Sequence, residues 1–172
     1  MELYKKYRPA DWDDVVGNSA VVKSLRDKIE KGTLPHFIVF AGLPGTGKTT
    51  VARLIGRIYK ALGLLSKGHV VEVNRSHLVA EFVGQTAPKT SAVIDSAMYG
   101  ILFIDEAYML TSEGRGGFGL EALETLLSRM DGCRGRMVVI VAGYPEKMEH
   151  FLRANPGLSR RFPVENRFAF PD

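Results

Sequence analysis

The chain has 172 residues, the usual size of one compact domain. Hydrophobic residues make up 45% and charged residues 24%, with 18 glycines, 8 prolines and one cysteine, which excludes the disordered, collagen-like and disulfide-stabilised classes. The net charge of +4 is too small to indicate a nucleic-acid partner by itself. The apolar runs, such as 37–41 and 137–142, are too short to span a bilayer, and the first residues lack a secretory signal pattern, so we expect a cytoplasmic protein with no membrane partner.

Short apolar runs bounded by turn residues alternate along the chain with segments of helical periodicity. This alternation is typical of parallel strands joined by crossover helices. Glycines crowd residues 112–120, which predicts a mobile loop there. We therefore predict an α/β fold of three layers, a five-stranded parallel sheet with helices on both faces. In chain order the predicted elements are a helix over 19–31, a strand over 37–41, a helix over 48–62, a strand over 69–73, a helix over 89–98, a strand over 101–105, a helix over 120–130, a strand over 137–142, a helix over 146–152 and a strand over 164–170.

A phosphate-binding loop is predicted between the first strand and the helix that follows it. Gly42 to Thr49 fits the pattern G-x-x-x-x-G-K-T in the strand-to-helix context that this motif requires. Glycines let backbone N–H groups turn toward a phosphate, Lys48 supplies a cation for it, and the Thr49 hydroxyl suits Mg²⁺. The alternative is a glycine-rich turn that fits the pattern by chance. The position of the segment between a predicted strand and a predicted helix argues against this alternative. The predicted nucleotide-binding residues of this segment are Pro44, Gly45, Thr46, Gly47, Lys48, Thr49 and Thr50.

Two carboxylates stand at the end of the predicted strand over 101–105. Asp105 and Glu106 stand at the end of this strand, where open α/β sheets present side chains to a ligand. Asp105 is predicted to help hold Mg²⁺, and Glu106 to polarise a water molecule that attacks the γ-phosphate of a bound nucleotide. The alternative is that both acids only cap the next turn, which is hard to reconcile with a phosphate loop in the same chain.

At this point the sequence resembles the AAA+ ATPases, a family of P-loop NTPases. The phosphate loop corresponds to Walker A, and residues 101–106 correspond to Walker B. From about Ser76 onward the chain is most similar to the branch that contains red-type Rubisco activase and stage V sporulation protein K. The segments that carry this resemblance are 82–90, 102–108, 141–145 and 155–163.

The resemblance also implies how the chain is organised. Residues 1–172 correspond to the large ATPase subdomain, and the helical lid that follows it in the family is absent from this sequence. The first 17 residues are more similar to clamp loaders and branch-migration helicases, in which the equivalent stretch lies against adenine. Val15, Val16 and Gly17 are therefore expected to contact the base.

Two further sites are implied by the resemblance. Phe82, Val83 and Gly84 match the aromatic, aliphatic and glycine pattern of the pore loop that grips polypeptides in AAA+ remodellers. The alternative for Phe82 is a core position at the end of a helix, since most aromatic side chains are buried. Tyr144 falls in the sensor 1 region, which commonly carries a polar residue such as asparagine.

Arg160 and Arg161 stand where the family places an arginine finger, which a neighbouring subunit inserts to neutralise charge on the terminal phosphate. Arg161 is our first choice and Arg160 our second. The alternative is an ordinary solvated pair of arginines.

The function that this resemblance implies is binding and hydrolysis of ATP with Mg²⁺ and ADP as product, in a nucleotide-dependent ring that remodels a protein client. Two alternatives stay open. One is a clamp-loader or helicase-like ATPase that acts on DNA. The other is a nucleotide-binding domain with little turnover because the lid is missing.

Overall fold

The computed structural model describes residues 19–112 and 117–171. Val15, Val16 and Gly17 therefore lie outside the described residues. In chain order the elements are α3 (Ser19–Glu30), β1 (Phe37–Ala41), α4 (Lys48–Ala61), β2 (Val70–Val73), α5 (Arg75–Leu78), α6 (Thr86–Ser96), β3 (Ile101–Ile104), η1 (Ala107–Leu110), α7 (Phe118–Cys133), β4 (Val138–Gly143), α8 (Pro145–Arg153), α9 (Pro156–Arg161), η2 (Val164–Asn166) and β5 (Arg167–Ala169).

Five parallel strands form a single sheet in the order β2-β3-β4-β1-β5. The strand β1 lies between β4 and β5, with Val39 opposite Val141 on one side and Arg167 on the other. Nearly every residue of β1, β3 and β4 is buried, which explains why these strands read as continuous apolar runs rather than alternating patterns. The predicted fold class is confirmed.

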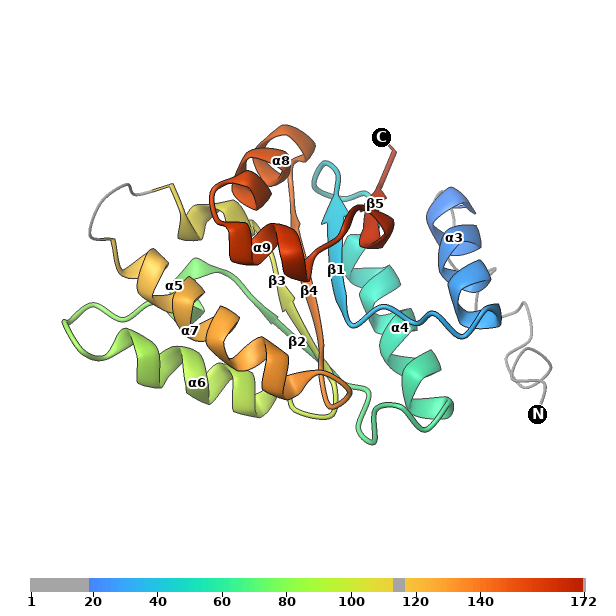
Figure 1. Cartoon of the computed structure of the whole chain (residues 1–172), viewed down its shortest axis with the longest axis horizontal. Helices are drawn as coiled ribbons and strands as arrows, with labels where there is room; N and C mark the ends of the chain where they lie inside the picture. The colour runs from blue at the N-terminus through green and yellow to red at the C-terminus, as the bar shows by residue number, and fades with distance from the viewer. Residues whose placement is uncertain (1–18, 113–116, 172) are drawn as a thin grey trace.

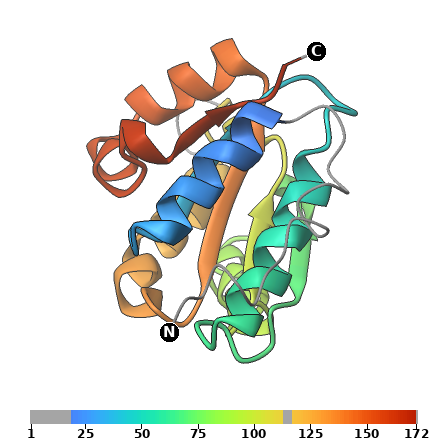
Figure 2. The ribbon, with the colours of Figure 1, turned by 90° about the vertical axis from the view of Figure 1, so that its right-hand side faces the viewer.

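Helices cover both faces of this sheet (Figure 1). On one face α3 and α4 lie side by side, as Figure 2 shows, and their apolar residues pack with Phe40, Phe103 and Ile140 of the strands. On the other face α5, α6, α7, α8 and α9 pack on strand residues such as Val139. Two apolar cores therefore hold the sheet in place. Because the strands are parallel, the carboxyl ends of β1, β3 and β4 lie at the same edge of the sheet.

The helix α4 shows how the sequence builds the edge that carries the phosphate loop. It begins directly after Gly47, whose φ of 90° ends the loop in a left-handed conformation that favours glycine. Its buried residues recur at helical spacing and include Val51, Ile55 and Ile58. Each fully buried Val or Ile side chain contributes about 1.5–3 kcal/mol to folding. The apolar face therefore anchors the helix, and its first turn carries the polar residues Lys48, Thr49 and Thr50 at the loop.

The structure differs from the sequence prediction in three places. Residues 164–166 form the 3-10 helix η2, and only Arg167–Ala169 pair with β1, so the last strand is shorter than expected. The helix α9 was not predicted, because its six residues are too few to show an apolar period. Of the segment 112–120, predicted as a mobile loop, residues 113–116 lie outside the described residues, and the chain is helical from Phe118.

Gly119 lies inside α7 rather than in a loop. A Cβ at this position would lie 2.4 Å from the carbonyl oxygen of Leu110. The glycine therefore permits close approach of α7 to η1.

Candidate functional site

The loop between β1 and α4 is shaped by glycines and closed by one lysine. Gly45 and Gly47 have φ of 78° and 90°, values that other residues rarely adopt. The Lys48 ammonium donates hydrogen bonds to the carbonyl oxygens of Gly42 and Leu43, at 2.9 Å and 2.6 Å, and reaches the Thr46 hydroxyl at 3.4 Å. The Lys48 side chain thus folds back over its own loop, and its ammonium group lies against the backbone carbonyls at the start of that loop.

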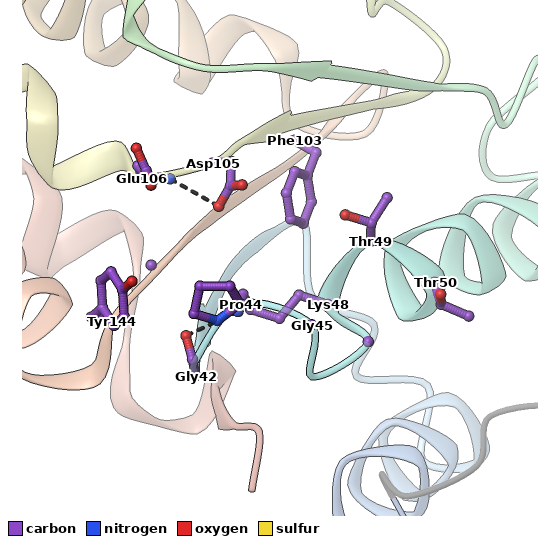
Figure 3. Close-up of a pocket in the computed structure, with 12 residues that line it drawn as sticks. Gly42, Pro44, Gly45, Lys48, Thr49, Thr50, Phe103, Asp105, Glu106 and Tyr144 are labelled. Atoms are coloured by element: carbon purple, nitrogen blue, oxygen red, sulfur yellow. Dashed lines mark hydrogen bonds between the residues drawn. The ribbon is translucent and has the colours of Figure 1, made fainter. Parts of the chain in front are cut away.

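A cavity of about 400 Å³ opens beside this loop at the carboxyl edge of the sheet (Figure 3). Figure 3 shows Asp105, Glu106 and Tyr144 at one side of it and Thr49 and Thr50 at the other. The predicted loop residue Thr46 does not line the cavity, because its hydroxyl donates to the Leu43 carbonyl at 2.7 Å. The lining residues are Gly42, Pro44, Gly45, Gly47, Lys48, Thr49, Thr50, Phe103, Asp105, Glu106, Gly143 and Tyr144.

Lys48 is a buried cation whose hydrogen-bond acceptors are neutral. Only 9% of the residue is exposed, and no carboxylate of the described residues forms an ion pair with it. Burial lowers the pKa of Lys48, and the carboxylate of Asp105 opposes that shift. Because a buried charge is costly without a counter-charge, this arrangement favours an anion in the cavity. The residues present therefore fit a phosphate group.

The two acids follow β3 directly, and their geometry separates their side chains. The backbone N–H of Glu106 donates to Oδ1 of Asp105 at 3.0 Å, while the N–H of Asp105 donates to the carbonyl of Val73 on β2. Glu106 has φ 49° and ψ 44°, a left-handed conformation that is uncommon outside glycine and costs about 1–3 kcal/mol. The turn thus leaves the Glu106 side chain exposed at the cavity while Asp105 stays half-buried.

A third carboxylate, Glu72 on β2, was missed by sequence reasoning. The Thr49 hydroxyl donates a hydrogen bond to Oε1 of Glu72 at 3.4 Å. The signal available in the sequence was a single acid inside an apolar strand. No group of three or more His, Cys, Asp or Glu side chains gathers around a metal site in the described ranges.

Tyr144 follows β4, where sensor 1 was expected, and it lines the cavity. Its ring lies 6.3 Å from the ring of Tyr108, and the Lys147 ammonium lies 4.9 Å and 5.2 Å from the centroids of Tyr108 and Tyr144. Sequence reasoning assigned no role to Tyr108 or Lys147. Their spacing in sequence gave no signal, because Tyr108 comes from η1 and Lys147 from α8.

The predicted pore-loop residues lie away from the cavity, between α5 and α6. Phe82 is 65% exposed and Val83 is 87% exposed, so the core alternative for Phe82 is wrong. Gly84 has φ 81°, which permits the turn into α6. The helix α5 ends at Leu78, whose side chain fills the core position instead.

Arg160 and Arg161 lie at the end of α9, and neither lines the cavity of its own chain. The Arg161 guanidinium donates to Oδ2 of Asp131 at 2.9 Å and to the Gly157 carbonyl at 3.1 Å. Arg160 is exposed, and its side chain has no hydrogen-bond or ion-pair partner within 19–112 and 117–171. The two arginines therefore differ: Arg161 is held by contacts within its own chain, whereas the Arg160 side chain is exposed.

Throughout the described part of the chain, no helix has both the length and the apolar character that crossing a bilayer requires.

Comparison with known proteins matches the sheet and its site to one family. The model of the ATPase family associated with various cellular activities (AAA) matches residues 38–169. The chain is 50% identical over 150 residues to stage V sporulation protein K of Bacillus subtilis, covering 87% of this chain and 46% of that protein. It is 55% identical over 128 residues to the ESX-3 secretion system protein EccA3 of Mycolicibacterium smegmatis, covering 74% of this chain and 21% of that protein. The chain thus spans less than half the length of these relatives.

A solved structure, the FIGL-1 AAA domain in complex with ADP, has the same fold with a TM-score of 0.62 at 23% identity. The likeness covers 92% of this chain and 55% of that one. The family model covers well over half of the chain and includes the phosphate loop and both acids. The chain belongs to the AAA family of ATPases.

Proposed function

We propose that this chain binds ATP and ADP with Mg²⁺ in the cavity beside Lys48 and hydrolyses ATP there. The observation that carries the proposal is the buried Lys48 ammonium, which faces only neutral acceptors in a cavity that also receives Asp105 and Glu106. Residues 1–172 then correspond to the large ATPase subdomain of the family. The FIGL-1 AAA domain, whose fold is similar, was solved in complex with ADP.

Each lining residue has a distinct proposed task. Lys48 exchanges its hydrogen bonds to the Gly42 and Leu43 carbonyls for phosphate oxygens, which gives its buried charge a partner. Glu106 accepts a proton from the attacking water, since its side chain is exposed at the cavity. Thr49 and Asp105 would hold Mg²⁺, which supplies charge neutralisation at the phosphates when bound.

We propose that hydrolysis is completed by a neighbouring subunit in a ring. Neither Arg160 nor Arg161 lines its own cavity, so a contribution from α9 has to reach a second chain. Arg161 is held by Asp131, and this contact favours Arg160 as the arginine that extends to the neighbour. This order reverses the one suggested by the sequence.

The proposed substrate is a polypeptide. The exposed pair Phe82 and Val83 offers apolar contact area that suits an extended chain. Apolar side chains at a loop tip do not suit DNA, whose backbone is bound by cations and is sensitive to salt. Tight binding of single- or double-stranded DNA with a steep salt dependence would support the DNA-acting alternative instead.

The proposed activity is tested by ATP turnover measured as a function of protein concentration, with oligomeric state followed in parallel. Turnover per chain is expected to rise with concentration as rings form. Glu106→Gln should bind nucleotide with little turnover, and mixtures of Arg160→Ala with Lys48→Ala should recover part of the activity, since each supplies what the other lacks. Turnover that is independent of concentration in a monomeric protein would contradict the ring, and no turnover in proven rings would leave the binding-only alternative.

A further inference from the structure

The ends of β3 and β4 are connected by an aromatic contact that the proposed reaction does not use. Tyr108 lies two residues after Glu106, and Tyr144 directly follows β4. Their ring centroids are 6.3 Å apart with an interplanar angle of 47°. The segment that carries the proposed catalytic acid therefore contacts, through one side chain, the residue in the sensor 1 position.

This contact is built into the backbone of β4. A Cβ at Gly143 would lie 2.8 Å from Cε1 of Tyr108 and 2.9 Å from Sδ of Met148, closer than real Cβ atoms come. Only glycine lets the Tyr108 ring lie directly on the strand end. The ring is half-buried there, and burial together with the nearby Glu106 carboxylate raises the pKa of the Tyr108 hydroxyl.

Lys147 covers both rings from the first turn of α8. Its ammonium lies 4.9 Å from the Tyr108 centroid and 5.2 Å from the Tyr144 centroid, within the range of cation–π attraction. No carboxylate in residues 19–112 or 117–171 forms an ion pair with it. A single cation that contacts both rings holds them together more firmly than the ring contact alone.

We propose that Tyr108 and Lys147 are positioning residues that hold Tyr144 toward the end of the cavity where the terminal phosphate of ATP would lie. This inference rests on the proposed function, because it gives the aromatic cluster a task only if ATP occupies the cavity. Tyr144 reaches the cavity, whereas Tyr108 and Lys147 do not line it. They act through Tyr144. They also act through Glu106, because Tyr108 lies two residues after it and fixes the segment that carries it.

Variants of Tyr108 and Lys147 should change the preference of the chain for ATP over ADP rather than its stability. Lys147→Met and Tyr108→Leu remove the cation and the ring. We expect each to weaken binding of a non-hydrolysable ATP analogue about tenfold relative to the wild type, which is about 1.4 kcal/mol, while ADP affinity stays within about twofold. Lys147→Arg and Tyr108→Phe keep the cation and the ring, so they should preserve the ratio. Lys67→Met is the matched control, because Lys67 is an exposed lysine outside the cluster.

Two measurements on the full chain separate the possible failures. Calorimetric titration with Mg²⁺ gives the ratio of affinities for the ATP analogue and ADP. Nuclear magnetic resonance of the nucleotide-free chain reports whether the Lys147 ε-methylene protons are shifted upfield by the two rings, and whether Tyr108→Leu reduces that shift.

The expected result is an upfield shift in the wild type together with a lowered ratio in Lys147→Met and Tyr108→Leu. If the wild type prefers the ATP analogue, and both variants keep the same ratio of affinities for the ATP analogue and ADP, the positioning role alone would be overturned. An upfield shift in a wild type that binds neither nucleotide would overturn the proposed function, and the positioning role with it. An absent shift would overturn the cluster itself.

Discussion

Arg161 and Asp131 connect the last residue of α9 to the carboxyl-terminal half of α7 through an ion pair of 2.9 Å. The Arg161 side chain is only 15% exposed, whereas Asp131 is 64% exposed. The guanidinium also donates to the Gly157 carbonyl within its own helix. A short helix of six residues thereby gains a contact that its own length does not supply.

The two adjacent arginines should therefore behave differently when truncated. Arg161→Ala is expected to lower the free energy of unfolding by about 1–2 kcal/mol, because it removes a half-buried ion pair and a charged hydrogen bond. Arg160→Ala should change that free energy by less than about 0.5 kcal/mol and should depress ring-dependent ATP turnover. Urea denaturation and turnover assays on both variants check this. Equal stabilities, with turnover lost only in Arg161→Ala, would restore Arg161 as the residue that reaches the neighbour.

Glu72 should affect the metal requirement rather than the protein's stability. A Thr49 hydroxyl that donates to Glu72 keeps its lone pairs free for a cation, as outer-sphere carboxylates do at metal sites. Glu72→Gln is expected to raise the Mg²⁺ concentration needed for half-maximal ATP binding by about tenfold or more. Mn²⁺ binding followed by electron paramagnetic resonance gives an independent readout. Glu165→Gln, at an exposed acid on η2, is the control, and identical metal dependence in the two variants would contradict the role.

Phe82 should be dispensable for folding but needed for client handling. Because 65% of Phe82 is exposed, Phe82→Ala should lower the free energy of unfolding by less than about 0.5 kcal/mol. We expect it to abolish binding of a fluorescently labelled unfolded polypeptide and to leave nucleotide affinity unchanged. Leu64→Ala, at another exposed apolar residue, should keep polypeptide binding. Retained binding by Phe82→Ala would argue against the pore-loop assignment.

His36 gives the protein a predictable sensitivity to acid. Burial lowers the pKa of His36 below its ordinary value of 6.5, and the nearby Arg134 lowers it further. Below pH 6.5 the unfolded chain therefore binds more protons than the folded chain, so the free energy of unfolding falls as the pH drops through this window. His36→Gln removes that component. Denaturation curves at about pH 7.5 and about pH 5 should show a smaller loss for His36→Gln than for the wild type, and parallel losses would refute the assignment.

The fold and the phosphate loop could be predicted because their signals are local. A strand such as Ile101–Ile104 is a short apolar run, and Gly42 to Thr49 is a contiguous motif. The 3-10 helix η2 is not predicted because Val164 and Phe168 both lie in one apolar run of the sequence, whereas in the structure Phe168 is buried and Val164 is exposed. Exposure of Val164 depends on how the chain leaves α9, which no short sequence window records.

The parts of the site that were missed depend on contacts between distant segments. Glu72 meets Thr49 across 23 positions, and Tyr108 meets Tyr144 across 36. Likewise, the sequence around Arg160 and Arg161 does not show that Asp131 forms an ion pair with Arg161 and not with Arg160. These pairings follow from how the strands and helices pack together, so they become visible only in the three-dimensional structure.

The most direct test of the account is calorimetric titration of the chain with ADP and Mg²⁺, comparing the wild type with Lys48→Met. Met keeps most of the buried volume and removes the charge, so the variant should fold, which circular dichroism verifies. We expect saturable binding by the wild type and binding at least about a hundredfold weaker, or about 2.8 kcal/mol, by Lys48→Met. Equal affinity of the two proteins for ADP would contradict the assignment of the cavity beside Lys48 as the nucleotide site.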